Sequence, residues 1–134
     1  MDAKVLWRGG MTFTGTADSG FEVGLGTDPA VGGDNDGFRP MELMAISLAG
    51  CTAMDVISIL KKKRMQISGL RVHISGQRDE AYPRRYTDIH LTYVVCGNAV
   101  NSAGVEQAID LSEKKYCGAM ASLNAKITHS YRIE

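Results

Sequence analysis

Apolar and polar residues alternate with a period of two in the first part of the chain, a pattern typical of β-strands. Residues 4–8 and 11–14 alternate in this way, and Gly9 and Gly10 between them suit a two-residue turn. Residues 21–25 alternate again after a turn-forming Asp-Ser-Gly. The pattern predicts a β-hairpin followed by a third strand, which together form a three-stranded meander.

The next segment, residues 37–64, is mostly apolar and predicts one long helix. Pro40 suits the first helical position, because the N–H that proline lacks would be unbonded there anyway. Within residues 41–60 only Glu42 and Asp55 are charged, so the helix is apolar nearly all round. Such a helix is buried on nearly all sides. In a chain of 134 residues, we expect the protein's own sheet and a second subunit to bury it together.

The same segment is formally long enough to cross a bilayer of about 30 Å at about 1.5 Å per residue. Polar side chains such as Glu42, Thr52 and Asp55 would be costly in lipid, so we predict no membrane span. No signal peptide is visible before the first strand, which leads us to expect a cytoplasmic protein. Lys plus Arg and Asp plus Glu both number 15, so the charge gives no reason to expect a nucleic-acid partner.

Strand patterns return after this helix. Residues 70–77 and 86–96 alternate and are expected to pair as a long hairpin, and residues 127–133 alternate as a final strand. The apolar face of the second of these strands carries four residues, Ile89, Leu91, Tyr93 and Val95. We expect this face to lie against the core.

A second helix is predicted between these strands. Asn101 or Ser102 can cap it, and apolar residues recur at helical spacing as far as Tyr116, so the helix delivers Cys117 at its end. At most a short further helix follows before the last strand. The predicted order is βββ-α-ββ-α-β, an α+β fold in a single domain over residues 1–134.

No cofactor or metal is expected. The glycine- and aspartate-rich loop 26–38 lacks the spacing of a calcium loop and the glycine pattern of a phosphate-binding loop. None of the three histidines lies near a cysteine at metal-ligand spacing.

Three cysteines, Cys51, Cys96 and Cys117, are an odd number and form no Cys-x-x-Cys pair, which fits a reducing compartment. Buried free cysteines are common small hydrophobic residues, so a purely structural role is one interpretation. The other is a redox pair formed by Cys51 and Cys117, each on or at the end of a helix. Cys96 ends a strand, and we expect it to be dispensable.

Four short motifs carry a resemblance to a known family. They are Pro40-Met41-Glu42-Leu43 followed by Ala45, Leu48-Ala49-Gly50-Cys51-Thr52, Lys114-Lys115-Tyr116-Cys117, and Ile127-Thr128-His129-Ser130-Tyr131. The sequence resembles the OsmC/Ohr family of small thiol peroxidases, and its YhfA-type branch in particular. The resemblance covers nearly the whole chain, and the two cysteine segments are its most specific part.

The resemblance implies an intertwined homodimer with an OsmC-like fold, in which long central helices are wrapped by β-sheets. It also implies that Cys51 attacks the O–O bond of an organic hydroperoxide and becomes a sulfenic acid. Cys117 then captures the sulfenic acid as a disulfide, and a dithiol reductant, a small thiol or a redox protein, restores both thiols. A nearby second thiol stops the oxidation at a reversible stage.

Peroxidases of this family activate the thiolate with an N-terminal arginine and a glutamate just before the cysteine helix. Here the glutamate position falls on Met41, one residue before Glu42, and residues 9–13 contain no arginine, so Arg39 is the nearest substitute and Arg8 a weaker one. Twelve residues separate Arg39 from Cys51, about 18 Å of helical rise, so either the preceding loop folds back or the partner subunit supplies Arg39, and we favour the partner.

The predicted catalytic residues are therefore Cys51, Cys117, Glu42 and Arg39. Two functions follow from this interpretation. One is a thiol-dependent peroxidase that acts in the response to oxidative stress. The other is a non-peroxidatic dimer that binds a small apolar ligand at the subunit interface, with Cys51 as a redox-sensitive wall.

Overall fold

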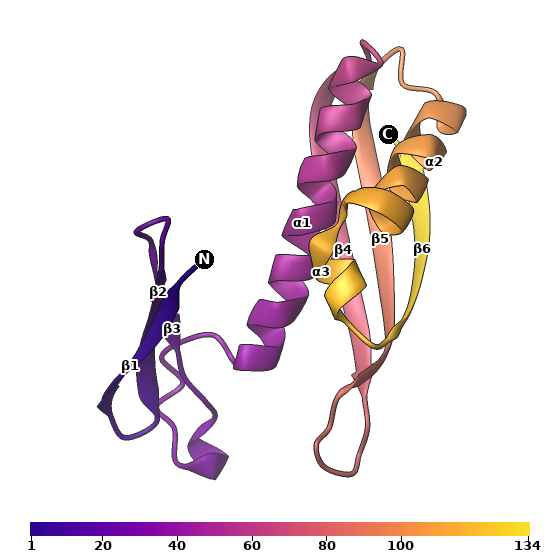
Figure 1. Ribbon diagram of the computed structural model, residues 1–134. Coiled ribbons are helices and arrows are strands. Elements are labelled where there is room, and N and C mark those ends of the chain that lie inside the picture. The colour runs from indigo at the N-terminus through magenta and orange to yellow at the C-terminus, as the bar shows by residue number, and fades with distance from the viewer. The chain divides into compact units, whose positions relative to one another are not determined.

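A computed structural model describes all residues, 1–134, and confirms the mixed α+β architecture (Figure 1). It adds two short helical turns to the predicted order and contains the short further helix expected before the last strand. The elements are β1 (Ala3–Gly9), β2 (Thr12–Ala17), β3 (Glu22–Leu25), the 3₁₀ turn η1 (Pro29–Val31), α1 (Pro40–Lys62), β4 (Gln66–Arg78), β5 (Tyr86–Asn98), α2 (Ser102–Leu111), the π-helical turn η2 (Ser112–Tyr116), α3 (Gly118–Ser122) and β6 (Lys126–Ile133). The chain divides into two compact units, residues 1–44 and 45–134, and each is described by itself.

The N-terminal unit holds the antiparallel sheet β1-β2-β3. The predicted meander is confirmed, but its first turn was placed one residue too early. Gly9 pairs with Thr12, so the turn residues are Gly10 and Met11. The register shifts between Trp7 and Gly9, and this irregularity moves the turn along the chain. Gly9 and Gly10 adopt φ of +108° and +53°, values that glycine tolerates better than other residues.

The N-terminal unit has almost no interior of its own. Its only fully buried residues are Gly15 and Gly26. Large apolar side chains of the sheet and its loops remain exposed, and Phe21 is the extreme case at 81%. The others are Val5, Leu6, Trp7, Met11, Val31 and Phe38.

The C-terminal unit is built on the sheet β4-β5-β6 with β5 at its centre. Strand β5 pairs antiparallel with β4, as the predicted hairpin requires, and parallel with β6. Parallel neighbours need a crossover, which α2, η2 and α3 provide. Figure 1 shows α1 and α2 on the same side of this sheet.

The core lies between this sheet and the helices. The predicted inward face of β5 is confirmed, because Ile89, Leu91, Tyr93 and Val95 are all buried. Helix α1 adds Leu48, Thr52, Val56 and Leu60, one residue per turn, and α2 adds Val105, Ala108 and Ile109. Apart from Thr52, these residues belong to one continuous hydrophobic cluster.

The stripe of buried residues on α1 is narrower than the sequence predicts. Other apolar residues on the helix stay accessible within one chain, such as Ile46 and Met54, which is 76% exposed. Helix α1 is long and apolar enough to cross a membrane by length and composition alone. One face of α1 packs into the core of the C-terminal unit through this buried stripe.

The second helix departs from the predicted spacing at its end. Tyr116 was expected on the buried face but is 51% exposed. Helix α2 ends at Leu111 and continues as the π turn η2, where the Cys117 N–H donates to the Ser112 carbonyl oxygen at 2.8 Å. A π turn inserts one extra residue, which shifts later side chains by about 100° around the axis. Tyr116 consequently faces outward and Cys117 faces the core.

Candidate redox site

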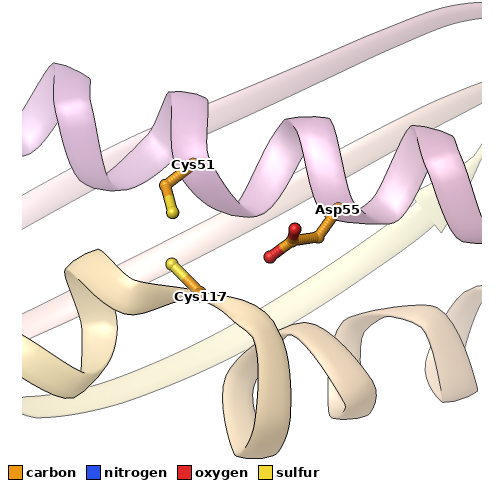
Figure 2. A group of neighbouring side chains, drawn as sticks. All are labelled: Cys51, Asp55 and Cys117. Carbon is orange, nitrogen blue, oxygen red and sulfur yellow. The ribbon is translucent and has the colours of Figure 1, made fainter.

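Two segments far apart in the sequence bring Cys51 and Cys117 together. Cys51 lies in the middle of α1, and Cys117 follows the π turn η2. Their sulfur atoms and a carboxylate oxygen of Asp55 lie within 4.8 Å of one another. Asp55 is on the same face of α1 as Cys51, one turn further along. Figure 2 shows the two sulfurs pointing toward each other with the Asp55 carboxylate beside them. Both cysteines are free thiols.

The two thiols differ in their surroundings. Cys117 is only 3% exposed, and burial, together with its hydrogen bond to Cys51, raises the pKa of its thiol to about 11. Cys117 therefore keeps its proton at neutral pH. Its sulfur also accepts the Met120 N–H at 3.4 Å, a contact that fixes the side chain at the start of α3. Cys51 is half-buried, so a small molecule reaches it more readily than Cys117.

A line of buried hydroxyl groups leads from the sheet to Asp55. The Tyr93 hydroxyl lies 2.8 Å from Thr52 Oγ1, and Ser112 Oγ lies 2.9 Å from both Thr52 Oγ1 and Asp55 Oδ2. Each hydroxyl has one proton to donate, and an ionised carboxylate only accepts. Ser112 Oγ donates toward both Thr52 Oγ1 and Asp55 Oδ2, and the Tyr93 hydroxyl can donate to Thr52 Oγ1.

Burial raises the pKa of Tyr93 to about 12, so its hydroxyl stays neutral and acts as the first donor of this hydroxyl chain. The sheet, α1 and η2 are thereby joined through one set of hydrogen bonds. Because Tyr93, Thr52 and Ser112 are fully buried, any of these groups left without a partner would be costly. The hydroxyl chain therefore fixes the Asp55 carboxylate, which lies beside the two sulfurs.

A histidine supports the π turn from the sheet. His129 Nδ1 lies 2.6 Å from Glu113 Oε1, and Glu113 belongs to η2. The His129 ring also meets the Tyr93 ring edge-on, with centroids 6.3 Å apart. No metal site was predicted at the histidines. His129 instead positions the turn that carries Cys117.

The other two predicted site residues have partners within residues 1–44. The Arg39 guanidinium donates to Asn35 Oδ1 at 2.6 Å and to the Gly37 carbonyl oxygen at 3.2 Å. Glu42 Oε2 accepts the Arg39 backbone N–H at 3.0 Å, as the glutamate of a helix capping box does. Their contribution to Cys51 chemistry stays a prediction.

Sequence reasoning missed Asp55, Thr52 and Ser112 as parts of the site. A signal for Asp55 was present, since it is one of two charges in a long apolar segment and lies one helical turn after Cys51. Ser112 gave no comparable signal, because its position depends on the π turn.

The family follows from this fold and this pair of thiols. Residues 33–132 match the family described as OsmC-like protein, and the chain belongs to that family. It is 37% identical over 138 residues to Protein YhfA of Escherichia coli K12, which covers 99% of this chain and 98% of that protein. The resemblance seen in the sequence is confirmed.

Solved structures agree with this assignment. A hypothetical protein from Aquifex aeolicus is 32% identical, with a TM-score of 0.82 over 99% of this chain and 96% of that one. The organic hydroperoxide resistance protein OhrB of Bacillus subtilis shares the fold at 20% identity, with a TM-score of 0.62 over 98% of both chains.

Proposed function

We propose that this protein is a thiol-dependent peroxidase that reduces organic hydroperoxides through Cys51 and Cys117. The observation that supports this best is the approach of an accessible thiol and a buried, protonated thiol to within 4.8 Å of each other. Membership of the OsmC-like family and the shared fold of OhrB, an organic hydroperoxide resistance protein, support the same chemistry. A reducing compartment such as the cytoplasm suits the two free thiols.

The reaction divides between the two cysteines. The Cys51 thiolate attacks one oxygen of ROOH, the O–O bond breaks, and the alkoxide leaves as ROH after taking a proton. Cys51 is then a sulfenic acid. Cys117 attacks the Cys51 sulfur, the S–O bond breaks, and the oxygen leaves as water with the proton of Cys117. A dithiol reductant reduces the resulting disulfide and is itself oxidised to a disulfide.

We propose that the working form is a homodimer. Accessible apolar side chains on α1, among them Ile46 and Met54, support this, because a second chain would remove them from water. Family resemblance favours the same arrangement. In such a dimer, Arg39 of the partner subunit supplies the positive charge that stabilises the Cys51 thiolate.

The same accessible apolar residues support the second candidate, binding of a small apolar ligand at the dimer interface. The two candidate functions differ in whether Cys51 has to react. A binding protein would bind its ligand as tightly in a Cys51→Ser variant as in the wild type, whereas a peroxidase would lose its reaction.

The test is consumption of cumene hydroperoxide and hydrogen peroxide with dithiothreitol as reductant. We expect multiple turnovers, faster with cumene hydroperoxide, and complete loss in Cys51→Ser. With one equivalent of cumene hydroperoxide and no dithiothreitol, Cys117→Ser should react once and accumulate sulfenic acid, detected by dimedone labelling. Cys96→Ser is the matched control and should react like the wild type. Wild-type turnover in Cys51→Ser would exclude the proposal.

A further inference from the structure

The proposed peroxidase reaction does not involve Asp55. Its carboxylate is half-buried beside both sulfurs and takes part in no ion pair of this structure. A negative charge there opposes formation of a thiolate on Cys51, because like charges at short range repel. The hydroxyl chain nevertheless fixes this carboxylate in the site. The peroxidase reaction does not explain why the Asp55 carboxylate is held where it disfavours the Cys51 thiolate.

A bound cation that accepts both sulfur and oxygen ligands would offset the repulsion between the Asp55 carboxylate and the Cys51 thiolate. Two cysteine sulfurs and one carboxylate oxygen are ligands that Zn²⁺ accepts, and hard cations such as Mg²⁺ and Ca²⁺ avoid sulfur. Zn–S and Zn–O bonds of about 2.3 and 2.1 Å place tetrahedral ligand atoms roughly 3.5–3.8 Å apart. The three ligand atoms here lie within 4.8 Å of one another, so closure by at most about 1.3 Å completes that geometry.

The surroundings of the cluster also resemble those of a metal site. Ser112 donates to Asp55 Oδ2 and leaves Oδ1 free, and outer hydrogen bonds of this kind orient the ligands of metal sites. The Met120 N–H points at the Cys117 sulfur and stabilises negative charge on it. All of these groups belong to residues 45–134.

We propose that the reduced protein binds one Zn²⁺ per chain through Cys51 Sγ, Cys117 Sγ and Asp55, with a water molecule in the fourth position. Each thiol that becomes a ligand releases one proton to solvent. A disulfide between Cys51 and Cys117 removes two of the three ligands, so oxidation releases the metal. Only this release step rests on the proposed peroxidase function.

The binding test uses the full-length protein, reduced and kept without oxygen. Zn²⁺ is titrated in competition with a chromophoric chelator, and Co²⁺ is added separately to detect thiolate ligands by their charge-transfer absorption. We expect one equivalent of either metal and a thiolate band with Co²⁺. Asp55→Asn should weaken Zn²⁺ binding by at least about tenfold, and Cys51→Ser and Cys117→Ser should weaken it further. Cys96→Ser, the control for a thiol outside the site, should bind like the wild type.

Two outcomes would overturn the zinc site: wild-type affinity in Asp55→Asn, or equal affinity in the wild type and Cys51→Ser. Circular dichroism establishes that each variant is folded, and Asp55→Glu replaces Asp55→Asn if the latter is not, since it retains a carboxylate and should retain Co²⁺ binding. A protein that turns over cumene hydroperoxide but binds no Zn²⁺ refutes only the zinc site. One that binds Zn²⁺ but is not oxidised by hydroperoxide refutes only the peroxidase.

Discussion

The sheet of residues 45–134 is covered on its apolar face, whereas the sheet of residues 1–44 is not. Both contain a three-stranded sheet with alternating apolar residues. In the C-terminal unit, helices cover the apolar face and β5 is buried along its inward side. In the N-terminal unit the corresponding aromatic and aliphatic side chains are exposed, with Phe21 at 81%. The same alternation therefore predicts a strand in both units but does not say which atoms will cover it.

This contrast has a consequence for stability. A small sheet without a covered apolar face is marginal in water, since burial of apolar area is the main favourable term in folding. The N-terminal sheet needs atoms from outside its own residues. The C-terminal unit already holds a continuous core, and the two thiols lie against that core.

The largest expected effect is on the C-terminal core. Leu91→Ala removes a fully buried side chain from β5 and should lower the free energy of unfolding by about 2–5 kcal/mol. Phe21→Ala is the matched change on the N-terminal sheet and should cost less than about 0.5 kcal/mol if its side chain stays as exposed as it is in the single chain. Urea denaturation followed by circular dichroism measures both. A cost for Phe21→Ala close to that for Leu91→Ala would show that a partner covers this sheet.

The next largest effect is expected on the stability of the proposed dimer, through the accessible face of α1. Burial of a methionine side chain contributes about 1.5–3 kcal/mol, so Met54→Asp should weaken the proposed dimer by at least that amount per chain. We expect a dimer at micromolar concentration by light scattering for the wild type and a monomer for Met54→Asp. Glu106→Gln, an exposed change on α2, serves as the control. A monomeric wild type would remove the main support for a dimer.

A smaller effect is expected from substitution of Arg39. This change tests whether the N-terminal unit contributes to the chemistry of the C-terminal unit. If Arg39 stabilises the Cys51 thiolate, Arg39→Ala should slow cumene hydroperoxide reduction by about tenfold, or about 1.4 kcal/mol, with little change in the melting temperature. The reaction of iodoacetamide with Cys51, followed from pH 5 to 9, measures the same loss without peroxide. Arg71→Ala, which changes an exposed arginine of β4, is the control with the same charge change. Equal rates in Arg39→Ala and the wild type would eliminate Arg39 as the activating group.

The smallest effect is a dependence of stability on pH. In the folded protein the pKa of Cys117 is about 11, above its ordinary value of 9.0, so the unfolded chain loses this proton first as pH rises. The stabilising contribution is complete below pH 9 and is lost between pH 9 and about 11. Melting temperatures over this range should fall less steeply in Cys117→Ser than in the wild type. Parallel curves for the two proteins would contradict a raised pKa for Cys117.

Much of the fold could be predicted because period-two alternation and one long apolar run are local signals. They placed α1 at Pro40 and the inward face of β5 correctly. The approach of Cys51 to Cys117 came from the family resemblance and not from spacing, since contacts between distant segments leave no local pattern. The π turn was missed because nothing in residues 112–116 departs from ordinary helical spacing.

The parallel pairing of β6 with β5 was missed for a similar reason. An alternating strand looks the same in either direction, and only the crossover through α2, η2 and α3 decides it. The hydroxyl chain was also out of reach, since Thr52, Tyr93 and Ser112 come from three different elements. The sequence therefore did not predict how separate elements contact one another.

The face that Cys117 presents depends on one extra residue in the π turn. If the turn relaxed to ordinary α-helical bonds at constant length, Tyr116 would move to the inward face and Cys117 would rotate by about 100° away from Cys51. Deletion of one residue within 113–116 would instead keep Cys117 inward, because Cys117 would then take the helical position of residue 116. The pair of thiols should therefore survive loss of one residue from this segment, and relatives that retain both cysteines can differ in its length by one residue and keep the same site.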